Sequence, residues 1–337
     1  MTPLLLQLLG CGGEPLETVS VVGEGRLHHE ISGPTWEVPN QAVGDAVPVD
    51  GGAVAAIAGS TLRIEGDRMP KSGHGTPRFG GPEFELVEGA LELPAVVGVW
   101  DLELVYNHEV VSFPVVTTWA APIEGTPLYQ PMLLWTGEWL AGLPSKAVTP
   151  EAELAEVENL LALKVLRGMT ALDGRSYGAF PRPKDKDNQA HVWLDFERSA
   201  CGEHRAGLMD MVETHGVDAQ WVMMSFREPS PEKLSMYETR VIAAVGREEK
   251  VWQHWNHVAV EVNGQVYDPS YDLHAESWGA YEDDIFGRYC FGEEEACKTP
   301  GGWCQQPRPE GTCIDNPPGF DTEDPLMAMT VWRGDDY

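Results

Sequence analysis

An Asn-Gly pair at residues 263–264 separates two short segments rich in apolar and β-branched residues. This dipeptide is a strong signal for a two-residue β-hairpin turn, because both turn positions need positive φ. The segments on either side, 255–262 and 265–269, are therefore expected to pair as antiparallel strands. Pairing places His257 and Asp268 on neighbouring strands within hydrogen-bonding reach.

A cysteine stands at the expected start of a helix upstream of this hairpin. Leu208, Met211 and Val212 repeat at helical spacing, Cys201 lies at the beginning, and Gly216 ends the helix. Unpaired backbone N–H groups and the helix dipole favour negative charge at this end, so the position favours a reactive thiolate. Residues 221–226 then read as a buried strand.

Cys201, His257 and Asp268 together supply the parts of a thiol catalytic triad. Cysteine is the nucleophile, histidine takes its proton and later gives it to the leaving amine, and aspartate fixes the imidazole. Asp268 precedes a proline and could instead begin a turn, so Asp272 is the alternative orienting acid.

Three motifs in this region resemble the transglutaminase-like superfamily of cysteine enzymes. They are Ala200-Cys201-Gly202, the element at 216–219, and Tyr-Asp-Pro at 267–269. The resemblance implies a papain-like core in which a helix carrying the cysteine packs on an antiparallel sheet. It also implies that Cys201 is the nucleophile, His257 the base and Asp268 the orienting acid. Ala259 stands where the family often has an aromatic residue, which leaves the substrate class open.

An oxyanion hole would combine the backbone N–H of Cys201 with a donor from upstream. Trp193 and Gln189 are the two candidates for that second donor.

A zinc site is the competing interpretation, because Cys201-x-x-His204 and His254-x-x-His257 offer four ligands. Positions three apart on a strand point to opposite faces, so His254 and His257 are expected to diverge if both lie in the hairpin. We therefore expect neither a metal nor a cofactor, and His204 to be a helper or a surface residue.

Four further cysteines lie close together, in the acidic C-terminal part of the chain. The four are Cys290, Cys297, Cys304 and Cys313. This even number predicts two disulfides, with three connectivities open. A four-thiolate zinc site is less favoured, because the spacing has no CxxC pair.

The N-terminus predicts export. Leu8-Leu9-Gly10-Cys11 follows an apolar run and resembles the lipobox of bacterial lipoproteins, which implies a signal peptide, lipidation of Cys11 and a membrane tether. Disulfides fit the same extracytoplasmic location, either in the cell envelope or as a secreted protein.

The acidic composition disfavours one class of partner. There are 53 Asp and Glu residues against 23 Lys and Arg, a formal charge of -30. Such a field repels a phosphate backbone, so nucleic-acid binding is disfavoured and a protein or peptide substrate is expected.

The expected fold class is α+β. Short alternating runs at 61–64, 84–87, 91–93, 100–106 and 110–116 predict a small Ig-like β-sandwich. Thr149 as N-cap and Pro150 at the first helical position predict a helix that stops at Gly168. The expected parts are a signal, lipobox and linker (1–16), the Ig-like domain (17–120), a connector (121–148), the catalytic domain (149–280) and a Cys-rich cap (281–337).

These features together predict an exported thiol hydrolase, a protease or amidase that attacks peptide or carboxamide carbonyls through a Cys201 thioester. Transfer of the acyl group to an amine, which would cross-link proteins, shares the first half-reaction and is the nearest alternative. A transglutaminase-like surface protein that binds without catalysis is the alternative from another class.

Overall fold

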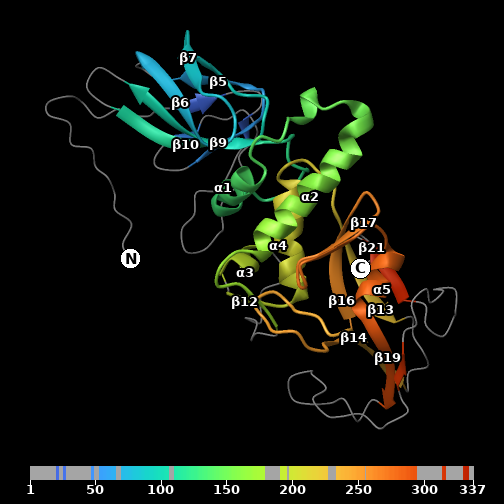
Figure 1. Ribbon diagram of the computed structural model, residues 1–337. Coiled ribbons are helices and arrows are strands. Elements are labelled where there is room, and N and C mark those ends of the chain that lie inside the picture. Colours follow the sequence, from blue (N-terminus) through green and yellow to red (C-terminus); the bar gives the residue numbers. More distant parts are fainter. Residues whose placement is uncertain are drawn as a thin grey trace. The chain divides into compact units, whose positions relative to one another are not determined.

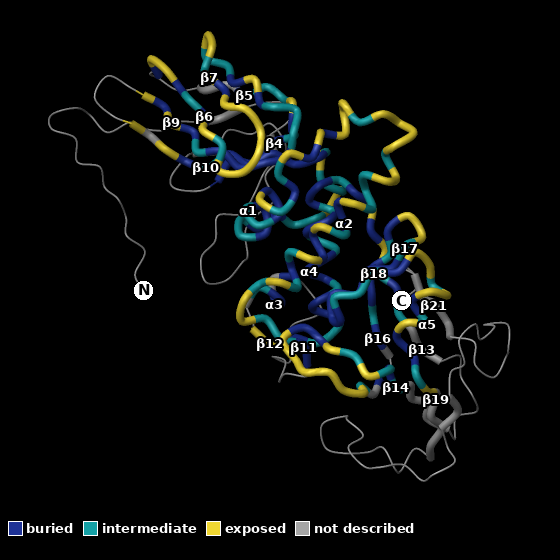
Figure 2. The backbone as a smooth tube through the Cα atoms, in the orientation of Figure 1, coloured by how far each residue is buried: buried dark blue, intermediate teal, exposed yellow. Residues whose placement is uncertain are grey.

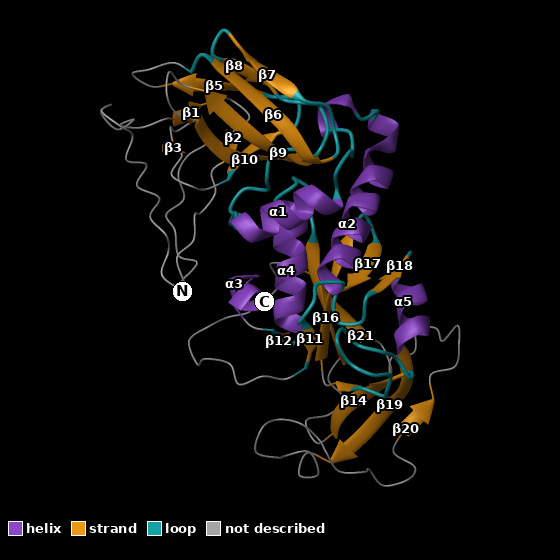
Figure 3. Ribbon diagram, turned by 60° about the vertical axis from the view of Figure 1, so that its left-hand side comes forward, coloured by secondary structure: helices purple, strands orange, loops and turns teal. Residues whose placement is uncertain are grey.

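The computed structural model shows a mixed α+β protein, which confirms the expected fold class (Figures 1 and 3). The structure describes residues 20–22, 26–27, 47–48, 53–65, 70–105, 110–178, 190–195, 197–226, 233–254, 256–293, 313–315 and 329–333. Two compact units divide the chain, one of residues 1–154 with 213–217 and one of residues 155–212 with 218–337. No helix in the described ranges combines the length and apolar character needed to cross a membrane.

The first unit is built on a nearly closed, barrel-like sheet. Its described strands follow the spatial order β2 (Arg26–Leu27), β4 (Val54–Ile57), β10 (Val110–Thr118), β9 (Gly98–Val105), β6 (Ser72–Phe79), β7 (Phe84–Val87), β8 (Ala90–Glu92), β5 (Thr61–Glu65), β1 (Ser20–Val22) and β3 (Val47–Pro48). Neighbours are antiparallel except β4 and β10, which run parallel.

Side chains along β9 alternate between a buried core and the solvent. Trp100, Leu102 and Leu104 are fully buried, whereas Glu103 between them is exposed. Five of the strand patterns are confirmed, as β5, β7, β8, β9 and β10. The sequence did not predict β6, because glycine and histidine interrupt its apolar pattern.

The segment expected as a connector belongs to the first unit. It contains α1 (Gln130–Trp139), and the single-turn 3-10 helices Lys146–Val148 and Glu151–Glu153 lie in or just after it. The expected cap of the next helix is wrong. The Thr149 hydroxyl donates back to the Ser145 carbonyl at 2.9 Å instead of accepting from the following turn. The helix that follows, α2 (Leu154–Thr170), also continues through Gly168.

The second unit contains three sheets. The described strands of the largest follow the order β18 (Leu273–Ala275), β17 (Gln265–Asp268), β16 (Asn256–Val262), β13 (Gln220–Phe226) and β21 (Met329–Arg333). Those of the second are β15 (Gln253–His254), β14 (Lys233–Thr239), β19 (Phe286–Glu293) and β20 (Cys313–Asp315). A short parallel pair joins β11 (Ser176–Tyr177) to β12 (Arg198–Ser199).

The predicted hairpin is confirmed in β16 and β17. Asn263 and Gly264 have φ values of 48° and 79°, and Val262 pairs directly with Gln265. Both turn residues thus adopt the left-handed conformation that a two-residue loop requires. The side chain of Asn263 donates to Glu158 of α2 at 3.0 Å, which fixes the turn to that helix.

In the described part of the chain, the helices of the second unit are α2, α3 (Ala190–Asp195), α4 (Cys201–Glu213) and α5 (Trp278–Ile285), and the first residue of α2 and the last of α4 fall in the first unit. Most of α4 is buried (Figure 2). Gly207 allows the close packing of α4, because a Cβ there would lie 3.0 Å from the Trp193 ring and 3.2 Å from Met169 of α2. The middle of α4, the helix that begins with Cys201, therefore packs closely against α2 and α3.

Candidate active site

Cys201 is the first residue of α4, as predicted. The backbone N–H of Ala200 donates to the buried carboxylate of Glu203 at 3.0 Å, and the N–H of His204 donates to the Ala200 carbonyl at 3.1 Å. This half of a capping box starts the helix. The first N–H groups of a helix have no intrahelical acceptor and carry partial positive charge. The partly exposed thiol of Cys201 lies at that end.

His257 and Asp268 form a buried pair on adjacent strands. Nε2 of His257 lies 2.7 Å from Oδ2 of Asp268, and both side chains have almost no exposed surface. β16 carries the histidine and β17 the aspartate, as the hairpin predicted. Because Nε2 is hydrogen-bonded to the carboxylate, Nδ1 is the ring nitrogen available to Cys201.

Two further donors hold the aspartate in place. The Tyr281 hydroxyl donates to Oδ2 of Asp268 at 2.6 Å, and the Ser270 backbone N–H donates to Oδ1 at 2.8 Å. A buried carboxylate is tolerated where donors satisfy its oxygens. Asp268 is therefore held in one orientation from β17, its following turn and α5.

The electrostatics of the pair favour charge separation. Burial alone would lower the pKa of His257, but the charge and hydrogen bond of Asp268, with a contribution from Cys201, raise it to about 10. Burial alone would raise the pKa of Asp268, but the His257 charge and its hydrogen bonds lower it. His257 is thus held as an imidazolium next to a carboxylate at neutral pH.

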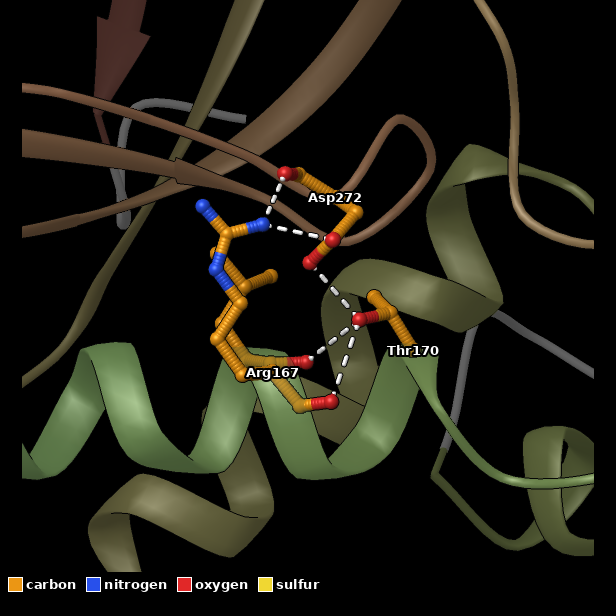
Figure 4. Close-up of polar contacts among 4 residues, drawn as sticks. Arg167, Thr170 and Asp272 are labelled. Atoms are coloured by element: carbon orange, nitrogen blue, oxygen red, sulfur yellow. Dashed lines mark hydrogen bonds and ion pairs between the residues drawn. The ribbon is translucent and has the colours of Figure 1, made fainter.

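Asp272 does not take the orienting role. Its carboxylate contacts the guanidinium of Arg167 and accepts from the Thr170 hydroxyl at 2.7 Å, both in α2 (Figure 4). Asp272 also adopts a φ of 53°, which aspartate tolerates better than most residues. The residue thus ties the turn after Asp268 to α2, and the aspartate at position 268 is the one that contacts His257.

Aromatic side chains surround His257. The ring of Tyr271 lies 5.3 Å from the His257 ring, that of Tyr177 lies 6.5 Å away, and that of His254 lies 4.9 Å away, all between ring centres. Trp252 packs against both tyrosines, at 5.2 Å from Tyr177 and 6.3 Å from Tyr271. The imidazole is thereby shielded from bulk water on several sides.

His254 and His257 would diverge only if both lay in the hairpin, and that condition is not met: their ring centres lie 4.9 Å apart. The two residues belong to different strands, β15 and β16, and these strands belong to different sheets. They do not lie on one strand, so the rule for positions on one strand does not apply. Nε2 of His254 instead makes a hydrogen bond with the Tyr271 hydroxyl.

The other histidines of the site are uncharged at neutral pH. Burial lowers the pKa of His254 well below its usual value, and the charge on His257 lowers it further. Burial lowers the pKa of His204 to about 4. His204 is buried against Tyr177, so a surface position is wrong. Over the described ranges, no three His, Cys, Asp or Glu side chains are grouped to hold a metal ion.

Of the two predicted oxyanion donors, the structure describes Trp193 but not Gln189. Trp193 is fully buried, with its ring against Gly207 and 4.3 Å from the guanidinium of Arg175. These contacts involve the second turn of α4 rather than its start. Gln189 lies outside the described residues, so its role stays a prediction.

Cys11, Cys297 and Cys304 also lie outside the described residues, and lipidation and disulfide pairing stay predictions. The backbone of Cys290 is in β19 and that of Cys313 in β20, where the two residues are direct partners.

A scan against models of known protein families found no match, and no curated protein matches the sequence.

Four residues of the site were not predicted from the sequence, namely Tyr177, His254, Tyr271 and Tyr281. His254 was considered only as a zinc ligand. Tyr271 lies three residues after Asp268, so its nearness along the chain was the available signal. Tyr177 and Tyr281 reach the site from other elements, β11 and α5.

Proposed function

We propose that this protein is an exported thiol hydrolase, a protease or amidase with a transglutaminase-like, papain-like core. One observation carries the proposal: a buried His257–Asp268 pair with its remaining ring nitrogen available to a thiol at a helix N-terminus. The three residue types stand in the chain order that nucleophilic thiol catalysis uses, and the His257–Asp268 contact is the one that its base needs.

The reaction follows from these groups. The Cys201 sulfur attacks the carbonyl carbon of a peptide or carboxamide, and the carbonyl electrons move to oxygen. As the tetrahedral intermediate collapses, the C–N bond breaks and the His257 imidazolium gives its proton to the leaving amine. A thioester then remains on Cys201. Water, deprotonated by His257, attacks the thioester, releases the carboxylic acid and restores the thiol.

Transfer to an amine is the alternative for the second half of this reaction. A lysine amine would replace water and give an isopeptide bond, and the first half-reaction would be unchanged. The aromatic residues around His257 shield the imidazole from bulk water, which is the observation that favours this alternative.

The surroundings of the core are proposed on sequence grounds. We take the first unit as an Ig-like spacer or docking module, Cys11 as a lipidated anchor and the location as extracytoplasmic. A fold alone gives the first unit no activity of its own.

Mass spectrometry after incubation with a mixed peptide pool tests the proposal. Hydrolysis of peptide bonds gives new termini, hydrolysis of glutamine gives deamidation, and transfer gives cross-linked peptides. Cys201→Ala is the matched control, and we expect all products and any acyl-enzyme mass to disappear with it.

Alkylation separates an enzyme from a binding protein. Iodoacetamide at pH 6 should label Cys201 selectively and rapidly, because a thiolate reacts and a thiol does not. Labelling no faster than that of a free model thiol, together with no product from the peptide pool, would favour the binding alternative.

A further inference from the structure

The turn after Asp268 also carries Tyr271, whose ring lies next to that of His257. Tyr271 is the third residue after Asp268, and its backbone N–H approaches the Asp268 carbonyl at 3.4 Å. Asp272, the next residue, is fixed to α2 through Arg167 and Thr170. One anchored turn therefore sets the positions of both the orienting carboxylate and the Tyr271 side chain.

The Tyr271 hydroxyl is held in a defined place. Its side chain is 5 % exposed, its oxygen is hydrogen-bonded to Nε2 of His254, and Tyr177 is its other side-chain hydrogen-bonding neighbour. Tyr177 belongs to β11, where it pairs with Ser199, two residues before Cys201. The hydroxyl is thus supported by elements that flank the nucleophile.

Tyr271 also lies within reach of the reacting groups. Its ring is 5.3 Å from the His257 ring, and Cys201 packs against the apolar cluster that contains Tyr177 and Tyr271. Burial raises the pKa of Tyr271 well above its usual value, and Tyr177, Asp268 and Cys201 act in the same direction. The hydroxyl therefore keeps its proton at neutral pH.

We propose that Tyr271 is a catalytic residue whose hydroxyl, together with the Cys201 backbone N–H, donates a hydrogen bond to the oxyanion formed on attack by the Cys201 sulfur. The inference rests on the proposed acyl-transfer chemistry and assigns the second oxyanion donor to Tyr271 rather than to Trp193 or Gln189.

His254 has a positioning role in this arrangement. It is neutral, so one ring nitrogen carries a proton and the other does not. With the proton on Nε2, the ring donates to the Tyr271 oxygen and does not take up the hydroxyl proton, which is left for Tyr177 or for the oxyanion. Because His254 is neutral, its closeness to His257 does not place a second positive charge in the site.

Two probes of the same sulfur separate this role from thiol activation. Iodoacetamide alkylation needs the thiolate but forms no oxyanion. Acylation by p-nitrophenyl acetate needs the thiolate and passes through a tetrahedral oxyanion, and the burst of nitrophenolate reports its rate. A group that acts only on the oxyanion therefore changes the acylation rate and leaves the alkylation rate unchanged.

Tyr271→Phe removes the hydroxyl and keeps the ring. We expect its acylation rate to fall by about 10²–10³-fold, the loss typical of one oxyanion donor, while alkylation of Cys201 stays close to the wild-type rate. Tyr267→Phe is the matched control, because that hydroxyl bonds Asn159 and Gln265 instead of the triad. Both of its rates should stay close to wild type.

A second pair of variants tests the same hydroxyl without altering Tyr271. His254→Gln keeps an N–H that can donate to the Tyr271 oxygen, and His254→Leu has none. We expect acylation to be retained better in the glutamine variant than in the leucine variant. Equal acylation rates for the two would remove the positioning role of His254.

The outcomes distinguish this inference from the proposed function. A wild-type protein with neither fast alkylation nor an acylation burst would refute the function itself. A wild-type protein with both, combined with an unchanged burst in Tyr271→Phe, would overturn the inference alone. If the burst were lost in Trp193→Phe but kept in Tyr271→Phe, the Trp193 indole would be the second oxyanion donor.

Discussion

The Tyr281 hydroxyl and the Nε2 atom of His257 share one oxygen of Asp268, at 2.6 and 2.7 Å. The hydroxyl comes from α5 and the imidazole from β16, so the carboxylate joins a helix to a strand. Tyr281 is itself fully buried and packs edge-on against Trp278 and Phe286. The position of the Asp268 carboxylate therefore depends on the packing of α5.

Tyr281→Phe should destabilise the protein and weaken the pair. A hydrogen bond to a charged group contributes about 1.5–3 kcal/mol, and its loss leaves a buried carboxylate oxygen with one donor fewer. We expect the free energy of unfolding in urea to fall by about that amount. An unfolding free energy equal to that of the wild type would show that Tyr281 does not support Asp268.

The pH dependence of stability should report the His257–Asp268 pair. The pKa of His257 is raised to about 10, so its contribution is complete below its unfolded pKa of roughly 6.5 and is lost as the pH rises through about 10. The pKa of Asp268 is lowered, so its contribution is present above its unfolded value of about 3.9 and is lost as the pH falls below that.

Unfolding free energies measured from about pH 2 to about pH 11, on both sides of the two transitions, check this expectation. His257→Gln cannot carry the charge, so the alkaline loss should be smaller in this variant than in the wild type. Identical alkaline slopes for the two proteins would contradict an imidazolium at position 257.

The sequence predicted the His257–Asp268 contact and the helix start at Cys201, because each of these residues was placed by a local signal. The Asn-Gly turn set the register that brings Asp268 next to His257, and the helical repeat put Cys201 at the first position of its helix. Turn chemistry and helix periodicity depend on nearby residues, so they can be read without a fold.

The support of the site could not be read in the same way. His254 and His257 looked like two positions of one strand, but β15 pairs with β14 and β16 pairs with β13. That division is decided by contacts between distant segments. A tyrosine such as Tyr281 has many roles in proteins, and only the packing of its helix shows that it faces Asp268.

Asp272 offers a test of the anchored turn. Its ion pair with Arg167 is about half exposed, with side chains 43 % and 51 % accessible, and such pairs contribute about 0.2–1 kcal/mol. Asp272→Asn keeps an acceptor for Thr170 and tolerates the φ of 53°, whereas Asp272→Val does neither. We expect the asparagine variant to lie within about 1 kcal/mol of wild type and the valine variant to lose more. Equal losses in urea unfolding would show that neither the backbone conformation nor the Thr170 bond matters.

The strand pair β19–β20 predicts which cysteines are joined. Cys290 and Cys313 are direct partners in its antiparallel register, and their side chains lie outside the described residues. Directly opposed residues have Cα atoms about 4.5–5.5 Å apart, within the span of about 4.4–6.8 Å that a disulfide bridges. Of the three connectivities, we therefore expect Cys290 with Cys313, which leaves Cys297 with Cys304.

Cleavage after glutamate without reduction distinguishes the connectivities. Glu293, Glu295, Glu310 and Glu323 divide this region so that Cys290 and Cys313 fall in separate peptides and the other two cysteines share residues 296–310. The expected pairing gives the Cys290 peptide linked to residues 311–323, and a separate peptide 296–310 that is two hydrogens lighter than its reduced form. Either alternative connectivity would instead join all three peptides. Cys201 serves as an internal control, because it should be recovered as a free thiol. Four free thiols in the native protein would refute both disulfides and return attention to a thiolate metal site.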